Sequence, residues 1–209
     1  MRNNVCKTCR RLGVKLFLKG EKCFSAKCPM VRKPYPPGPK KKRRARSLSE
    51  YGKELREKQK LRNWYNLSER QFKNYVRGVL DSKAKIGNAA ELLIKKLESR
   101  LDNTIFRLGF APSRVMARQL ISHGHFMVNK RAINISSYLV KKGDIISLKQ
   151  SSSKKGVFQN ISAILKKQTP PSWLQLDAEK MEGKVIGEPS FGEASPPAEI
   201  SSIFEYYSR

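Results

Sequence analysis

The stretch from residue 97 to residue 150 constrains the fold most, because the spacing of its apolar residues changes from helical to alternating along its length. Apolar residues first recur at helical spacing, which predicts one helix, at Leu97, Leu101, Ile105 and Leu108. Ser113 is a suitable N-cap for a second helix over residues 114–122. Two alternating pairs then predict a small hairpin, namely Phe126 with Val128 and Ile133 with Ile135. A turn at Gly143 leads into a strand over residues 145–148.

Arginines accompany both predicted helices. Arg100 and Arg107 lie off the apolar stripe and are expected to be in solvent. Arg114 and Arg118 are one turn apart, so they share a face of the second helix. With the residues that follow, they form a predicted row of cations: Arg114, Arg118, His123, His125, Lys130 and Arg131. Because guanidinium groups match phosphate oxygens in pairs, this row predicts a surface that follows a ribose-phosphate backbone.

The charge of the chain indicates the same class of partner. Lys and Arg number 44 against 17 Asp and Glu, a net charge of +27. Such an excess repels itself in a compact chain unless a polyanion neutralises it, so nucleic acid is the first expectation and an anionic membrane the alternative. Residues 1–62 hold 21 basic and 4 acidic side chains, whereas residues 170–209 hold 3 and 7. The carboxy-terminal part is therefore expected to face solvent or a basic protein.

The sequence lacks two features that would place the protein in a membrane or outside the cell. It contains no run of about 18 apolar residues of the kind that spans a membrane. Its amino end lacks the apolar core of a signal peptide. A cytoplasmic protein is therefore expected, and disulfides are uncommon in that compartment.

Four cysteines lie close together near the amino end, at Cys6, Cys9, Cys23 and Cys28. Two close pairs with a short loop between them can wrap a tetrahedral ion and leave no position for water. The first expectation is one structural Zn²⁺ per chain. An iron–sulfur centre and metal-free thiols or disulfides are the alternatives.

Residues 34–46 are rich in Pro and Gly and then in cations, namely Lys40, Lys41, Lys42, Arg43, Arg44 and Arg46. Pro and Gly exclude a packed helix or central strand here. The composition predicts a solvated, disordered tail in the free chain. The alternative is an arm that orders in an RNA groove, and the two describe compatible free and bound states.

Capping boxes predict three helices between the arm and residue 97, starting at Ser47, Ser68 and Asn88. Cations on the first two form either a solvated face or an RNA-binding surface, and the candidates for RNA binding are Lys58, Arg62 and Arg70. Beyond the hairpin we expect a linker over residues 151–156, a short helix near 158–165, and strands near 173–177 and 184–188. A short helix or extended tail is expected over residues 196–209.

The only catalytic pattern is Arg100-Leu101-Asp102 with Thr104, which resembles a motif of one class of pseudouridine synthases. The residues after Thr104 do not continue that motif, and the chain has no room for the separate catalytic domain. Asp102 is therefore predicted to be a helix residue that pairs with a neighbouring arginine. We expect a binding protein rather than an enzyme, without a small-molecule substrate.

The sequence resembles the bacterial-type S-four family of small-subunit ribosomal proteins along nearly its whole length. The resemblance includes the four-cysteine start and the stretches YGKELREKQKLR, ERQF, RLDN, RLGFA, ARQLI, HGH and EYYSR. The family usually has Gly where Lys130 stands and Pro where Ser136 stands. Lys at positive φ costs roughly 1–2 kcal/mol, so the sequence leaves the type of the turn at Asn129-Lys130 open.

The resemblance implies an α+β fold, in which a helical domain carries an inserted RNA-binding module of two short helices and a small antiparallel sheet. A zinc-knuckle-like extension and the basic arm occupy residues 1–46. The helical domain covers 47–97 and is completed by about 195–209. The inserted domain covers 98–194, with the module over about 98–150.

The resemblance also implies a function. The chain is expected to be a structural constituent of the small ribosomal subunit and a primary 16S rRNA-binding protein. Such a protein nucleates 30S assembly at a multi-helix junction of the 5′ domain, and contributes to accuracy near the mRNA entry channel beside proteins S-three and S-five. Further residues expected to bind RNA are Arg100, Arg107, Ser113 and Gln119. The alternative is a free-standing RNA chaperone or translational regulator that uses the same module.

Overall fold

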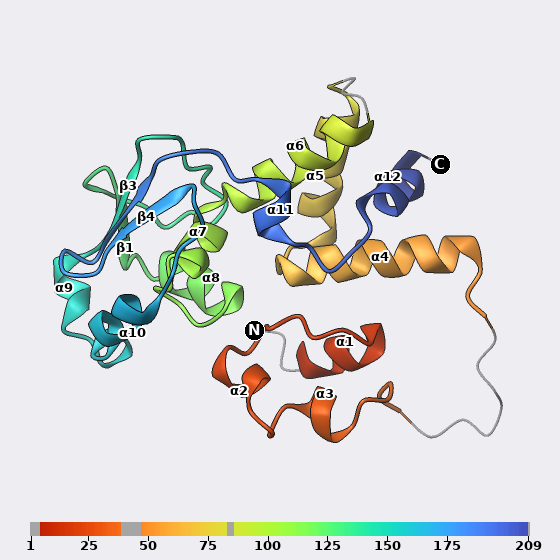
Figure 1. Cartoon of the computed structure of the whole chain (residues 1–209), viewed down its shortest axis with the longest axis horizontal. Helices are drawn as coiled ribbons and strands as arrows, with labels where there is room; N and C mark the ends of the chain where they lie inside the picture. The colour runs from red at the N-terminus through yellow and green to blue at the C-terminus, as the bar shows by residue number, and fades with distance from the viewer. Residues whose placement is uncertain (1–4, 39–46, 83–85, 209) are drawn as a thin grey trace. The chain divides into compact units, whose positions relative to one another are not determined.

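The structure is a computed structural model that describes residues 5–38, 47–82 and 86–208 (Figure 1). Two compact units divide the chain: the first holds the described residues up to Leu93 and from Ser195 onwards, and the second holds Ile94–Ala194. The first division falls inside helix α6 (Ile86–Glu98). Among the described residues, no helix is both long enough and apolar enough to cross a membrane.

The first unit begins with three short helices around the cysteines, namely α1 (Val5–Leu12), α2 (Glu21–Phe24) and α3 (Pro29–Arg32). Their small interior contains Leu12, Leu16 and Leu18 beside the thiols of Cys9, Cys23 and Cys28. Arg56 joins this segment to the next helix, because its guanidinium donates to the backbone oxygen of Leu12 at 3.0 Å.

Two longer helices follow, α4 (Glu50–Trp64) and α5 (Glu69–Leu80). The predicted start of α5 is confirmed, since the Ser68 hydroxyl accepts from the backbone N–H of Gln71 at 3.3 Å. The predicted start of α4 is wrong by two residues: the N-cap is Ser49, which accepts from Gly52 at 3.2 Å. Asn88 was expected to cap the third helix, but it lies within α6.

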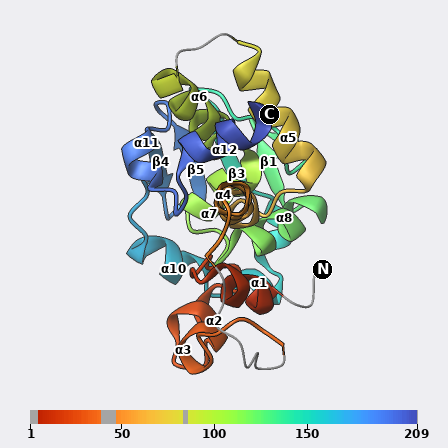
Figure 2. The same cartoon turned by 90° about the vertical axis from the view of Figure 1, so that its right-hand side faces the viewer.

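The carboxy-terminal helix α12 (Ile200–Ser208) packs on α4 and α5, as Figures 1 and 2 both show. Its buried side chains are Ile200, Ile203 and Phe204. The Tyr207 hydroxyl donates to the Glu69 carboxylate at 2.9 Å. The last residues of the chain therefore complete the core of the first unit.

The second unit contains a five-stranded antiparallel sheet of order β2-β1-β3-β5-β4. The strands are β1 (Phe126–Val128), β2 (Arg131–Ala132), β3 (Ile145–Leu148), β4 (Leu174–Asp177) and β5 (Glu182–Val185). One face of the sheet shares a core with helices α7 (Leu101–Arg107), α8 (Arg114–Ser122) and α10 (Ile161–Lys167). Leu97, Leu101, Ile105 and Leu108 are fully buried, as the predicted apolar stripe requires. The prediction that they share one helix is wrong, because Leu97 lies on α6 and Leu101 begins α7 after the extended backbone of Arg100.

The β1–β2 connection is a two-residue turn with both central residues at positive φ, 50° at Asn129 and 65° at Lys130. This is the geometry of a type I′ turn. Asn129 supports the turn, because its side-chain amide donates to Asp144 Oδ1 at 2.8 Å and its Oδ1 accepts from Ile145 N at 3.0 Å. The chain therefore keeps the turn that glycine favours, with Lys130 in the strained position.

Three further expectations for the second unit are wrong. The second hairpin strand is only Arg131–Ala132, and Ile135 is 59% exposed. The expected linker forms α9 (Gln150–Ser153) and a 3-10 turn, η1 (Gly156–Phe158), because Ser152 is buried against His125. Strand β5 begins two residues early, because Glu182 and Gly183 pair with Ser147 and Ile146 of β3. A last short helix, α11 (Phe191–Ala194), closes the unit.

Candidate nucleic-acid interface

The arginines of the second unit do not form one exposed row. Arg100 is 0% exposed and Arg114 is 5% exposed, so the expectation that Arg100 would lie in solvent is wrong. Arg100 is the N-cap of α7, and its backbone carbonyl accepts from the N–H groups of Asn103 and Thr104. Its side chain then turns inward along the helix start. A buried charge requires a partner of opposite sign.

That partner is Asp102, which binds two guanidinium groups. Arg100 donates to Asp102 through Nε at 3.0 Å and Nη2 at 2.7 Å. Arg118, on α8, donates through Nη2 at 2.9 Å. The prediction that Asp102 pairs with a neighbouring arginine is confirmed, and the pairing joins α7 to α8.

Glu98, at the end of α6, is the second buried carboxylate and contacts side chains of both α7 and α8. Arg107 donates to it at 2.9 and 3.1 Å, and the Asn103 amide donates at 2.6 Å. Arg114 lies with Nη2 3.8 Å from Glu98 and donates through Nε to Asn103 Oδ1 at 2.6 Å. We call Glu98, Arg100, Asp102, Asn103, Arg107, Arg114 and Arg118 the arginine network. Its members hold the helices together, and among them only Arg107 and Arg118 remain partly exposed, at 21% and 27% of their side chains.

Two other residues expected to bind RNA also have structural positions. Ser113 is buried and caps α8, since its hydroxyl accepts from Met116 N at 3.3 Å. His125 is buried with Nδ1 2.9 Å from the Ser152 hydroxyl. Burial lowers the pKa of His125, and the positive charges of nearby lysines lower it further. In contrast, His123 at the end of α8 is exposed and Gln119 is half-buried.

Exposed cations gather instead at two adjacent turns of the sheet. The hydrogen bond from Asn129 to Asp144 joins the β1–β2 turn to the turn before β3, and Lys141 N donates to Asp144 Oδ2 at 2.8 Å. We call the exposed cations of these turns the turn patch: Lys130, Arg131, Lys141 and Lys142. Lys141 and Lys142 were missed in the sequence, although the Gly143-Asp144 turn that follows them was recognised.

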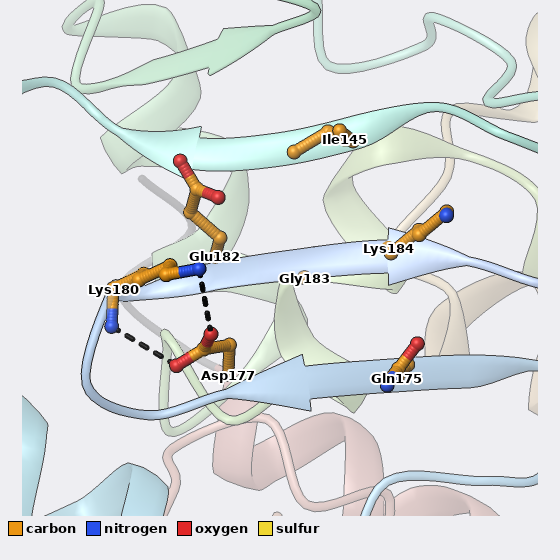
Figure 3. Close-up of a pocket in the computed structure, with 7 residues that line it drawn as sticks. All are labelled: Ile145, Gln175, Asp177, Lys180, Glu182, Gly183 and Lys184. Atoms are coloured by element: carbon orange, nitrogen blue, oxygen red, sulfur yellow. Dashed lines mark hydrogen bonds and ion pairs between the residues drawn. The ribbon is translucent and has the colours of Figure 1, made fainter.

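The open face of the sheet has a different character. Figure 3 shows a shallow hollow over β3, β5 and β4, lined by Ile145, Gln175, Asp177, Lys180, Glu182, Gly183 and Lys184. Asp177 and Glu182 occupy opposite positions in the β4–β5 register. Lys180 Nζ lies 3.9 Å from Asp177. The two carboxylates are balanced by Lys180 and Lys184, so this hollow lacks the excess of positive charge that the turn patch has.

Of the candidates on α4 and α5, only Arg70 is exposed. Lys58 is 5% exposed, with Nζ 2.6 Å from Glu69 and 4.6 Å from the centre of the Tyr206 ring. Arg62 is half-buried and binds the same carboxylate at 2.9 Å. Burial by itself would raise the pKa of Glu69, but the hydrogen bonds from Lys58 and Tyr207 outweigh burial and lower it.

Comparison of the sequence with those of known proteins identifies its family. Residues 1–98 match the family described as "Ribosomal protein S4/S9 N-terminal domain", and residues 99–146 match the "S4 domain". A relative from Syntrophomonas wolfei, named "Small ribosomal subunit protein uS4", is 47% identical and covers 99% of this chain and 98% of its own. The chain belongs to the uS4 family. The relatives of the same name from Caldicellulosiruptor bescii and Thermus thermophilus are 48% and 46% identical, each over 98% of this chain and 96% and 97% of their own.

The S4-domain match contains the turn patch and most of the arginine network. The four cysteines lie in the other matched region, and their thiols are free. Burial raises the pKa of Cys9, and the three other thiols add to this effect. In the part of the chain that the structure describes, no group of three or more His, Cys, Asp or Glu side chains is arranged to hold a metal. The predicted cations Lys40, Lys41, Lys42, Arg43, Arg44 and Arg46 lie outside the described residues.

Proposed function

We propose that this chain is a primary binding protein for 16S ribosomal RNA and that the turn patch forms part of the contact. As a member of the uS4 family, it is a structural protein of the small ribosomal subunit that binds ribosomal RNA. The single observation that carries the proposal is the match to uS4 proteins along 99% of the chain. We accordingly propose a cytoplasmic, ribosomal location and no enzymatic activity.

The turn patch suits folded RNA. Duplex RNA hides its base edges in a deep major groove, so proteins recognise its shape, phosphates and 2′-hydroxyls. Cations on two turns that are hydrogen-bonded to each other have little freedom to move apart. Rigidly placed cations favour one contour of phosphates over a flexible strand, which supports binding at a junction of several helices.

We further propose that the bound junction lies in the 5′ domain of 16S RNA and that binding there nucleates assembly of the subunit. Proteins S-three and S-five and the mRNA near its entry channel are the proposed neighbours, with an effect on decoding accuracy. The net negative charge of residues 170–209 supports a basic protein neighbour for that part of the chain.

The test is binding of the purified chain to the 5′ domain of 16S RNA at increasing salt. If about 8 phosphates are neutralised, the affinity should fall on the order of 10³- to 10⁵-fold between 50 and 200 mM salt. An unstructured RNA of the same length is the control. A preference for that control would overturn the proposal. In a second experiment, the chain should sediment with small subunits from a cell lysate, and its absence from them would favour a free-standing RNA chaperone or regulator.

We also propose that the four cysteines bind one structural zinc ion. Four thiolates are a donor set that zinc favours, and Cys9, Cys23 and Cys28 are buried in a segment with a small apolar interior. Backbone N–H groups support two of the sulfurs, since Lys19 N donates to Cys23 Sγ at 3.4 Å and Leu16 donates to Cys9. Bound zinc would contribute folding energy to this segment.

Metal analysis of the purified protein tests the zinc proposal, with about one zinc per chain expected. Replacement of all four cysteines by serine should abolish binding and lower the thermal stability of the segment. Iron with visible absorbance, or a chain that keeps its fold and stability without metal, would contradict the zinc site.

A further inference from the structure

The segment between α1 and α3 carries two stacked aromatic rings, of which Phe17 is half-buried and Phe24 is exposed. Phe17 and Phe24 stack with their ring centroids 5.0 Å apart and their planes at 28°. Phe24 is 75% exposed, more than any other large apolar side chain among the described residues. Phe17 covers part of one side of the Phe24 ring, and solvent reaches the remainder. The exposed part of the Phe24 ring is therefore a flat apolar surface, backed by Phe17.

The backbone at Phe17, one member of this pair, is strained. Its φ is 51°, in the left-handed region that bulky residues rarely adopt. The residues on either side are anchored in the interior, with Leu16 1% exposed and Leu18 7% exposed. The strained φ at Phe17 accompanies a side chain that lies against Phe24 and not in the interior. Strain of this kind clusters at ligand-binding positions.

The charge around the pair favours one class of partner. Residues 15–27 contain four lysines and one acid, namely Lys15, Lys19, Lys22, Lys27 and Glu21. Lys19, Lys22 and Lys27 are exposed. Aromatic rings interspersed with cations suit nucleic acid, because the rings stack on bases while the cations bind the flanking phosphates.

We propose that Phe24, backed by Phe17, stacks on an unpaired nucleobase of ribosomal RNA. Every base has a π face, so the contact is tolerant of sequence and specific for a base that has left its helix. The lysines of residues 15–27 bind the phosphates on either side of that base. This inference rests on the proposed RNA binding, and it adds a contact in the amino-terminal segment that is separate in the sequence from the turn patch.

The test compares three substitutions at one position, measured as affinity for the folded 5′ domain of 16S RNA. Phe24→Ala and Phe24→Leu should each weaken binding roughly tenfold, because neither keeps a π face, whereas Phe24→Tyr should bind like the original chain. The slope of affinity against salt should not change, since the lost contact carries no charge. Val31→Ala is the matched control, because Val31 is 53% exposed on the neighbouring helix α3.

Each alternative outcome has a clear meaning. Absence of RNA binding by the unsubstituted chain would overturn the proposed function itself. Normal binding by Phe24→Ala would overturn the stacking contact alone. Full affinity of Phe24→Leu would show that an apolar contact suffices, which contradicts stacking. Normal RNA affinity of Phe24→Ala together with poor incorporation into reconstituted subunits would also contradict stacking, and would assign the pair to a protein partner. If Phe24→Ala fails to fold, the difference in RNA affinity between Phe24→Leu and Phe24→Tyr still tests stacking.

Discussion

The arginine network and the turn patch both contain several cations of the same unit, but the cations of the network are largely buried and those of the patch are exposed. In the network, Arg100 is 0% exposed and donates to Asp102. In the turn patch, Lys130 is exposed on the two-residue turn and Arg131 is exposed at the start of β2. The network binds its charges to internal carboxylates, whereas the patch presents its charges to solvent and to RNA.

The difference teaches that the position of nearby carboxylates decides what an arginine does. Glu98 and Asp102 lie beside the start of α7, within reach of arginines from two helices. At the two turns of the patch, the carboxylate of Asp144 does not pair with a cation in this way, because its oxygens accept from the Asn129 amide and from Lys141 N. The same residue type therefore acts as internal scaffold at one place and as candidate ligand at another.

The largest expected effect follows from removal of a carboxylate that the network requires. Asp102→Ala should lower the free energy of unfolding by about 3–5 kcal/mol, because Arg100 would remain buried without its partner. Urea or guanidinium unfolding measures the loss. Glu179→Ala, which removes an exposed carboxylate of the β4–β5 turn, should stay within about 0.5 kcal/mol of the original chain. Equal effects of the two substitutions would contradict a special role for the network.

The next effect concerns RNA affinity rather than stability. Lys130→Ala combined with Arg131→Ala should weaken binding to the 5′ domain of 16S RNA on the order of 10- to 100-fold and reduce the salt slope by about 2. Filter binding at several salt concentrations measures both quantities, and the free energy of unfolding should hardly fall. Lys166→Ala with Lys167→Ala removes two exposed cations of α10 as a control. A similar loss in this control would show that the turn patch is not a preferred contact.

A third substitution separates charge from backbone strain within the patch. Lys130→Gly should raise the free energy of unfolding by about 0.5–1 kcal/mol, because glycine accepts positive φ more readily than lysine does. RNA affinity should fall at the same time, since a cation is lost. Lys141→Ala, at a residue without positive φ, should reduce affinity with unchanged stability. Any loss of stability in Lys130→Gly would contradict the strained turn.

The smallest effect is a pH dependence from a buried imidazole. The pKa of His125 is lowered from its ordinary value of about 6.5, mainly by burial. The unfolded chain therefore takes up a proton at higher pH than the folded chain. Stability is complete above about pH 6.5 and declines as the pH falls from there towards the folded pKa. Unfolding measured between pH 7 and pH 5 should show this decline, and His125→Gln should flatten it. His123→Gln, at an exposed position, is the control and should retain the decline.

Local signals in the sequence predicted much of the second unit correctly. The helix over residues 114–122 agrees with the structure at both ends, because its serine cap and following glycine act locally. Strand β3 also agrees at both ends. Strand β5 and the second hairpin strand were misplaced, and the start of β5 is set by its pairing with β3, which is distant in the sequence.

The sequence by itself determined the family, the excess of positive charge, the helical and strand periods, and the four-cysteine pattern, because each of these is carried by residue types and short spacings. Only the tertiary structure decided which cations are exposed. Arg100 and Asp102 are two residues apart, but Arg118 reaches the same carboxylate from another helix. Burial of a charge depends on which side chains converge in space, and helix packing brings that carboxylate within 2.9 Å of a residue sixteen positions away.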